Sequence, residues 1–257
     1  MRFTHAIVRP PSVTFADGIT TSGLGPPDLG LARAQHRAYC LALEGLGVSP
    51  VELPPDPAFP DSTFVEDAAV VTAAGALLTR PGAASRAGEV ASMAEALRPW
   101  YPEPARITAP GTLEGGDVCE AGSQVFIGVS ERTNAEGAAQ LAGWLARQDL
   151  PATTLDIRAL PGLLHLKTGL SWIGGRRLLA AGAIAEHEAL RGWEVIRVPA
   201  DEAYAANCVA VNGSLLLPAG FPRTRALLAG LGLGIVEIEM SEFRKMDGGP
   251  SCLSVHW

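Results

Sequence analysis

The chain has 257 residues, of which 47% are hydrophobic, and 20 Lys and Arg against 27 Asp and Glu give it a formal net charge of −7. This length and apolar content are enough to bury a sizeable core. The acidic balance argues against a nucleic-acid partner, which would need a clustered basic surface, and is compatible with a small cationic ligand.

The first residues, MRFTHAIVRPP, lack the apolar run of a secretory signal, and no apolar stretch approaches the length of a membrane span. The four cysteines include no CxxC pair, which argues against a disulfide framework or a structural zinc site. We therefore expect a soluble, cytoplasmic protein with no membrane partner.

The first predicted elements are a strand within 4–11, a helix over 29–45 and a strand over 49–53. Four later segments share one pattern, in which a polar residue precedes a short apolar run, a turn with Gly or Asn, and a second apolar run. This pattern is typical of a β-hairpin. The four segments begin at Glu66, Glu114, His165 and Asn207.

A helical stretch usually follows each hairpin, and a further strand follows the helix. We predict helices over 85–97, 134–147 and 223–231, and strands over 105–109, 153–157, 194–198 and 235–239. The GLGLG sequence at 230–234 follows a helix and precedes a strand. A phosphate-binding loop has the opposite order, so we interpret GLGLG as a helix C-terminal turn.

The polar residues that begin the hairpins recur every 42 to 51 residues, and Cys252 begins a fifth unit that the N-terminal elements could complete. Each unit is too small to bury its own apolar face, whereas five units around an axis bury their faces together. We therefore predict an α/β fold, a five-bladed α/β propeller of pseudo-fivefold ββαβ repeats, with 1–257 as a single catalytic domain. A generic α/β sheet is the alternative.

In such a ring Cys252 and His165 would converge, which suggests a thiolate nucleophile with a general acid/base. Cys252 lies in the glycine-rich turn DGGPSC, which would leave its side chain accessible. The other cysteines are expected in the core, and two other histidines that lie in predicted helices are expected at the surface. These residues are Cys40, Cys119, Cys208, His36 and His187.

Acidic residues form the third part of the predicted site. Asp61, Glu66 and Asp67 lie in FPDSTFVEDAA, and Glu114 lies with Asp117 in GTLEGGDV. Carboxylates that begin apolar strands would be partly buried, so they need a cationic partner. A guanidinium ligand would supply one, and the alternative is ion pairing with arginines of the chain itself.

Two arginines, Arg86 in RPGAASR and Arg132 in GVSERTN, follow the ends of hairpins and could bind the carboxylate of a substrate. Each is otherwise an ordinary surface residue.

Several motifs together resemble the bacterial dimethylarginine dimethylaminohydrolases of the guanidino-modifying superfamily. These motifs are FPDSTFVEDAAVV, LTRPGAASR, GTLEGGDV, SERTNAEGA, LHLKTGL, YAANC, PAGFPRTR and FRKMDGGPSCLS. The resemblance covers essentially the whole chain. It implies the propeller fold, hydrolysis of methylated arginine to citrulline and an amine, and no cofactor or metal. The implied partner is the small cationic amino acid itself, bound by a monomer or a homodimer.

The resemblance also implies roles for individual residues. Cys252 would be the nucleophile, His165 the proton donor and Glu114 an orienting carboxylate. The residues implied to contact substrate are Ile19, Asp61, Phe64, Glu66, Asp67, Arg86, Arg132, Met246 and Ser251. The chain has EGGD where the family also shows EAGD, and Ile19 where the family more often has Leu.

Four other functions are alternatives to this interpretation. An arginine deiminase would use the same catalytic residues, but those enzymes are usually longer. An amidinotransferase would need a much longer chain and an amine acceptor. A non-catalytic arginine-binding protein could share the fold, although this chain retains every catalytic residue type. A papain-like protease is disfavoured because Cys252 precedes no helix.

Overall fold

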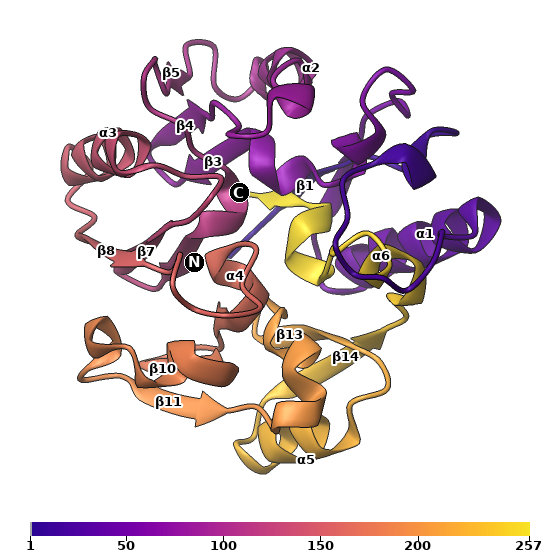
Figure 1. Cartoon of the computed structure of the whole chain (residues 1–257), viewed down its shortest axis with the longest axis vertical. Helices are drawn as coiled ribbons and strands as arrows, with labels where there is room; N and C mark the ends of the chain where they lie inside the picture. The colour runs from indigo at the N-terminus through magenta and orange to yellow at the C-terminus, as the bar shows by residue number, and fades with distance from the viewer. Residues whose placement is uncertain (1) are drawn as a thin grey trace.

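The computed structural model describes residues 2–257 and contains five three-stranded sheets arranged around a central axis (Figure 1). In four of them a hairpin of two antiparallel strands is followed by a third, parallel strand. The strands are β3 (Ala69–Thr72), β4 (Gly75–Leu78), β5 (Ala105–Arg106), β6 (Val118–Ala121), β7 (Gln124–Val129), β8 (Ala152–Asp156), β9 (Leu170–Trp172), β10 (Arg177–Ala180), β11 (Glu194–Arg197), β12 (Val209–Val211), β13 (Ser214–Pro218) and β14 (Gly234–Ile238).

The fifth sheet joins the two ends of the chain. Strand β15 (Val255–His256) pairs antiparallel with β1 (His5–Val8), which pairs in parallel with β2 (Ser49–Glu52). This sheet repeats the strand order of the other four, with the hairpin connection replaced by the chain ends. The predicted closure of a five-bladed ring is therefore confirmed.

The helices on the outside of the ring connect the hairpins to their parallel strands, as the α-helices of Figure 1 show. They are α1 (Leu29–Gly45), α2 (Glu89–Leu97), α3 (Ala135–Ala146) and α5 (Pro222–Gly230). Two short helices do not make this connection: α4 (Leu166–Gly169) precedes β9, and α6 (Ser241–Arg244) follows β14. Between β10 and β11 the connection consists only of the 3₁₀ turns η6 (Gly182–Glu186) and η7 (Glu188–Leu190).

Helix α2 begins later than its apolar periodicity predicts. The predicted start at 85 falls in a separate 3₁₀ turn, η4 (Ala84–Arg86), because Arg86 turns inward to bind buried carboxylates. The GLGLG segment behaves as predicted, since α5 ends at Gly230 and Gly232 has a positive φ of 75°.

Five clusters of buried apolar residues lie one between each pair of neighbouring units. For example, Phe126 of β7 packs with Leu178 of β10, and Leu179 of the same β10 packs with Leu215 of β13. Alternate residues of a strand thus contribute to different clusters, as the two faces of a strand require. No unit has a core of its own, which is the physical reason for the closed ring.

The polar residue that begins each repeat lies in or beside a short helix that precedes the inner strand, and not in the strand as predicted. These short helices are η3 (Val65–Ala68), η5 (Gly115–Asp117), α4, η8 (Ala200–Ala206) and η9 (Pro250–Leu253). The remaining short turns are η1 (Phe15–Asp17) and η2 (Pro60–Thr63). Because the backbone turns before each inner strand, successive residues of these short helices face opposite sides of the ring.

The expected surface position of His36 is wrong, because this side chain is fully buried on the inner face of α1. His187 is half-buried, and it caps η7 instead of lying inside a helix. Cys119 and Cys208 are buried in the core as predicted, and Cys40 is half-buried against it. Within residues 2–257, no helix combines the length and the apolar character that crossing a membrane requires.

Candidate active site

Cys252 lies in η9, where two loop glycines make a close turn possible. The backbone N–H of Gly249 points at Cys252 Sγ over 3.5 Å, and Asn207 Nδ2 lies 3.9 Å from the same sulfur. Asn207 Oδ1 also accepts a hydrogen bond from the N–H of Ser251 at 3.0 Å. Asn207, which begins the fourth repeat, therefore fixes the turn that carries the cysteine of the fifth.

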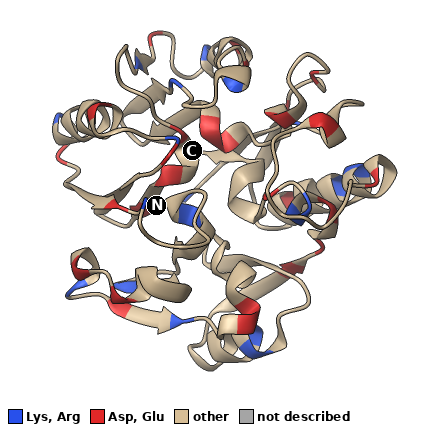
Figure 2. Cartoon of the chain, viewed as in Figure 1, with Lys and Arg blue, Asp and Glu red and all other residues tan. Residues whose placement is uncertain are grey.

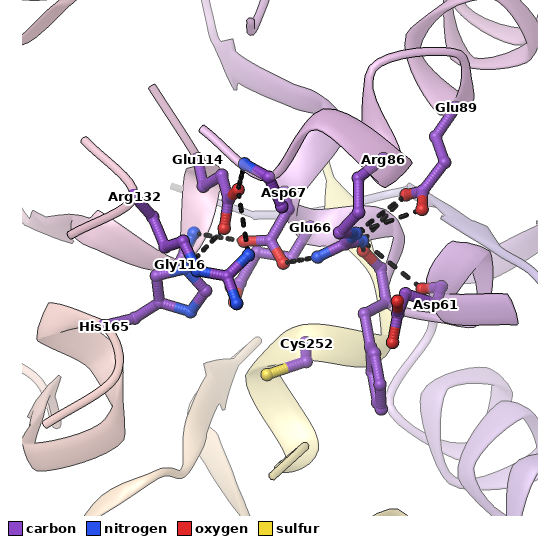
Figure 3. Close-up of polar contacts among 12 residues, drawn as sticks. Asp61, Glu66, Asp67, Arg86, Glu89, Glu114, Gly116, Arg132, His165 and Cys252 are labelled. Atoms are coloured by element: carbon purple, nitrogen blue, oxygen red, sulfur yellow. Dashed lines mark hydrogen bonds and ion pairs between the residues drawn. The ribbon is translucent and has the colours of Figure 1, made fainter. Parts of the chain in front are cut away.

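His165 is held against Glu114 from the second repeat. His165 Nε2 lies 2.7 Å from Glu114 Oε2, and Glu114 is fully buried (Figure 3). Asp117 accepts a hydrogen bond from the N–H of Leu166 at 2.9 Å and so anchors the start of α4 directly after His165. The histidine is thus positioned by two carboxylates of one EGGD motif.

The surrounding carboxylates determine the charge of the imidazole. Burial alone would lower the pKa of His165, but Asp67, Glu114 and Asp117 outweigh burial and raise this pKa to about 9. His165 therefore carries a proton at neutral pH. Burial together with Glu66 and Asp67 raises the pKa of the Cys252 thiol to about 12, so without a cationic ligand the cysteine is protonated too.

Asp67 is held by groups on both sides. Its Oδ1 accepts a hydrogen bond from the N–H of Gly116 at 2.8 Å, and its Oδ2 pairs with Arg86. Although burial opposes it, the nearby His165 and Arg86 hold the pKa of Asp67 below its ordinary value. A Cβ at Gly116 would lie 2.7 Å from His165 Nδ1, so any side chain here would displace the imidazole.

Arg86 is buried, and every nitrogen of its guanidinium contacts an acceptor of the protein (Figure 3). It binds Asp67, the carboxylate of Glu89 and the carbonyl oxygen of Phe64, which lies 2.9 Å from Nη2. Ion pairing with an arginine of the chain, the alternative considered from the sequence, is thus present at this position. Glu89 was not identified from the sequence. The only signal for it there is its position three residues after Arg86, a spacing that allows an ion pair.

Arg132 differs from Arg86, because its guanidinium forms only one ion pair among the described residues. Arg132 Nη1 lies 3.7 Å from Glu114 Oε1, beyond hydrogen-bond distance, and its side chain is 16% exposed. This cation can therefore accept an anionic ligand group without releasing a partner of the protein.

A segment near the N-terminus covers the site. The N–H of Ile19 donates to both carboxylate oxygens of Asp61, at 3.1 and 3.2 Å. Beyond it, the N–H of Thr21 donates to Asp247 at 2.6 Å, and Ser22 Oγ donates to the carbonyl of Lys245. These contacts are polar and on the surface, so this segment can open at a smaller cost than a core element.

Most of the predicted site residues line one small cavity of about 30 Å³. The lining residues are Ile19, Asp61, Phe64, Asp67, Arg86, Glu114, Arg132, Leu164, His165, Met246, Asp247, Gly248 and Cys252. Leu164, Asp247 and Gly248 were not proposed from the sequence, although they adjoin residues that were. A drug-sized ligand needs roughly 300 Å³ or more, so the cavity as it stands is too small for an arginine-sized molecule.

Glu66 and Ser251 do not line this cavity. Glu66 Oε1 lies 2.5 Å from Lys167 Nζ, and Glu66 Oε2 accepts a hydrogen bond from Ser251 Oγ at 3.0 Å. These side chains line a second, larger chamber on the axis of the ring. Lys167 was not proposed from the sequence, although it follows His165 by two residues in LHLKTG.

Asp67, Glu114 and His165 each offer one ligand atom within 4.8 Å of the others, so this group could also bind a metal ion. The hydrogen bond between His165 and Glu114 and the ion pair of Asp67 with Arg86 already use these atoms. The same carboxylate and imidazole groups could instead surround the positively charged carbon of a guanidinium. A thiol, a protonated imidazole and buried carboxylates around one cavity are suited to nucleophilic substitution at such a carbon.

Comparison with known proteins agrees with this chemistry. Residues 35–209 match the family model described as arginine deiminase. The N(G),N(G)-dimethylarginine dimethylaminohydrolase of Pseudomonas aeruginosa is 44% identical over 99% of this chain and 100% of its own. The enzyme of the same name from Streptomyces coelicolor is 38% identical over 97% of this chain and 95% of its own.

Two solved structures of dimethylarginine dimethylaminohydrolases are closely similar. A cysteine-to-serine mutant of the Pseudomonas aeruginosa enzyme complexed with citrulline superposes with a TM-score of 0.96 at 44% identity, covering both chains completely. A histidine-to-glycine variant of a dimethylarginine dimethylaminohydrolase, as its adduct with S-methyl-L-thiocitrulline, gives a TM-score of 0.95 at 44% identity over 99% and 100% of the two chains. This chain therefore belongs to the dimethylarginine dimethylaminohydrolase family, within the wider group that the arginine deiminase model describes.

Proposed function

We propose that this protein hydrolyses Nω,Nω-dimethyl-L-arginine, and the monomethyl form, to L-citrulline and dimethylamine or methylamine. The observation that carries the proposal is the meeting of Cys252 and His165 in one cavity with the buried carboxylates Asp67 and Glu114. A methylated guanidinium is a planar cation with an electrophilic carbon. It matches both the charge of these carboxylates and the chemistry of a thiolate.

Substrate binding would itself activate the nucleophile. The carboxylate field raises the pKa of the Cys252 thiol, and a guanidinium placed beside Asp67 cancels much of that field. The thiol then loses its proton while His165 keeps its own. A cysteine that is unreactive without substrate would become a thiolate only when the correct cation is present.

The thiolate of Cys252 then attacks the central guanidinium carbon and forms a C–S bond. His165 gives its proton to the dimethylamino nitrogen, the C–N bond breaks, and a thiouronium remains on the enzyme. The now neutral His165 removes a proton from water, whose oxygen attacks the same carbon. The C–S bond breaks, citrulline leaves, and the remaining proton passes to solvent. Glu114 keeps the imidazole oriented through both transfers.

The far end of the substrate would bind near the covering segment. We assign its carboxylate to Arg132, whose guanidinium is incompletely paired, and its amino group to Asp61 and the backbone near Ile19. Arg86 could bind the substrate carboxylate only if it first lost a contact with Glu89 or Asp67. We therefore assign Arg86 mainly to holding Asp67 in place. Glu66 would act from behind the site through Ser251.

Arginine deiminase activity is the second candidate, because the matching family model carries that name. The experiment is citrulline formation from dimethylarginine and, in parallel, from arginine, with Cys252→Ser as the control. Turnover of dimethylarginine well above arginine, lost in the control, supports the proposal. Preference for arginine would assign deiminase activity, and binding without turnover would assign an arginine-binding protein.

We further propose that residues 1–257 act as one catalytic domain, because the strands nearest the two ends share a sheet. The four cysteines are all free, which supports a reducing, cytoplasmic location. Whether the protein is a monomer or a homodimer can be measured by light scattering on the purified chain.

A further inference from the structure

We propose that His36, Cys40 and Glu52 form a binding site for a divalent cation of zinc type, separate from the catalytic cavity. None of the three lines that cavity or the axial chamber. The inference does not depend on the proposed reaction, because it rests on residues of α1 and β2 that the mechanism does not use.

The three residues meet through the packing of one helix on one strand. His36 and Cys40 are four residues apart on α1, so their side chains lie one above the other on the same face. Glu52 is the last residue of β2, on which α1 packs. A cation held by all three would join the helix to the strand in the unit that closes the ring.

The distances between the donor atoms fit a tetrahedral ion. His36 Nδ1 lies 3.7 Å from Cys40 Sγ, and one ligand atom from each of the three residues lies within 4.8 Å of the other two. Zinc bonds of about 2.3 Å to sulfur and 2.0–2.1 Å to nitrogen, at a tetrahedral angle, set these atoms about 3.6 Å apart. The nitrogen and sulfur are therefore already spaced as two ligands of one ion.

The charges suit the same ion. A neutral imidazole offers a lone pair on one ring nitrogen, and Nδ1 is the nitrogen of His36 that lies next to Cys40. Cys40 is normally protonated, and a cation would replace its thiol proton. One thiolate and the carboxylate of Glu52 then balance a divalent charge. The mixed nitrogen, sulfur and oxygen set favours zinc over calcium or magnesium, which prefer oxygen alone.

The burial of His36 points in the same direction. His36 is fully buried, and a buried imidazole needs a polar partner. The polar contact that this ring does make is through Nδ1 to Cys40. A metal bond at Nδ1 would offset the cost of burying the ring.

The experiment uses the full chain with Cys252→Ser, which removes the catalytic thiol as a competing ligand. After treatment with a chelator, Co²⁺ is added as a spectroscopic probe and Zn²⁺ as a stabilising ligand. A thiolate-to-cobalt charge-transfer band and a higher melting temperature with Zn²⁺ are expected. The catalytic group of Asp67, Glu114 and His165 contains no sulfur, so it cannot produce this band.

Three further substitutions in the same background identify the ligands. Cys40→Ser should abolish the band and the zinc-dependent shift of the melting temperature. Glu52→Gln should weaken Co²⁺ binding by about tenfold or more, because it removes a charged ligand. Glu103→Gln, at an exposed carboxylate without an ion pair, is the matched control and should change neither readout.

Two results would overturn the proposal. One is the absence of a cobalt–thiolate band in the folded Cys252→Ser protein. The other is a band that persists after Cys40→Ser, which would assign the metal to Cys119 or Cys208. In otherwise native protein, Cys40→Ser should leave citrulline formation unchanged, so failure of this proposal is distinct from failure of the proposed reaction.

Discussion

Two cavities lie against the same short helices at the centre of the ring, and they differ in size, in charge and in the elements that line them. The cavity that contains Cys252 measures about 30 Å³ and is surrounded by charged side chains. The axial chamber measures about 630 Å³ and is lined mainly by residues of the inner strands, such as Val70, Val118 and Val209. Figure 2 shows acidic segments near the middle of the ring as well as at its edge.

The wall between the two cavities consists of the short helices that precede the inner strands. Neighbouring residues in these turns face opposite sides, as Asp67 and Glu66 do, and Cys252 and Ser251. The pair Glu114 and Gly115 divides in the same way. The proposed catalytic residues therefore lie on one side of this wall, and the ion pair of Glu66 with Lys167 lies on the other.

The comparison predicts that the largest loss of activity comes from the His165 side. We expect His165→Gln to lower turnover of dimethylarginine by about 10²–10⁴-fold, the usual contribution of a general acid/base. Turnover of S-methyl-L-thiocitrulline should fall by a smaller factor, because its thiolate leaving group needs no proton. Equal losses for both substrates would contradict the assignment of His165 as proton donor.

The pH dependence of kcat/KM gives a second test of this pair. The reactive free enzyme needs a thiolate at Cys252, whose pKa is raised to about 12, and a protonated His165, whose pKa is raised to about 9. Below pH 9 kcat/KM should rise about tenfold per pH unit as the thiolate fraction grows. Above pH 9 loss of the imidazolium offsets that gain, so the profile should level. A maximum near pH 7 would be inconsistent with these shifts.

On the chamber side, the largest predicted effect is on stability. Lys167→Met leaves Glu66 buried without its cation, which should lower the free energy of unfolding by about 3–5 kcal/mol. Adding Glu66→Gln to the same chain should recover most of the loss. Arg98→Met breaks an exposed ion pair with Glu95 and should cost less than about 1 kcal/mol. Denaturant titration measures all three, and similar losses for Lys167→Met and Arg98→Met would contradict the role of the wall.

A smaller change within the wall tests how tightly it is packed. The added Cβ of Gly116→Ala would lie 2.7 Å from His165 Nδ1, so we expect a cost of about 1–3 kcal/mol in stability or in transition-state binding. Gly143→Ala, on the exposed side of α3 with no atom within 4 Å, is the matched control and should be neutral or stabilising. Full activity in the Gly116 variant would show that His165 tolerates displacement.

The smallest effect is expected in the chamber itself. Burial raises the pKa of Glu120 to about 7, so the folded state holds this proton more tightly than the unfolded state does. The resulting stabilisation is present below pH 4.5 and is lost as the pH rises to about 7. Glu120→Gln should therefore raise the melting temperature at pH 8 more than at pH 5 and leave turnover unchanged. A loss of turnover would mean that the two cavities are coupled.

The residues that meet at the axis could largely be predicted from the sequence because the repeat places them at equivalent positions. Glu114, His165, Asn207 and Cys252 each lie in or beside the short helix before the inner strand of their unit, and a closed ring brings these helices together. The apolar runs that define the strands are local patterns, so the strands can be predicted from the sequence alone. The outer helices are also local, and α1 has the predicted bounds, Leu29–Gly45.

What only the tertiary structure decided is which way each side chain faces and which charge it meets. Asp67 and Glu66 are neighbours of the same chemical type, yet the turn of η3 directs them to different cavities. Arg86 has no local signal that distinguishes it from Arg132, but in the folded chain it pairs with Asp67 of an earlier turn and is buried. Sequence patterns carry the period of a repeat, whereas ion pairing depends on distances between residues far apart in the chain.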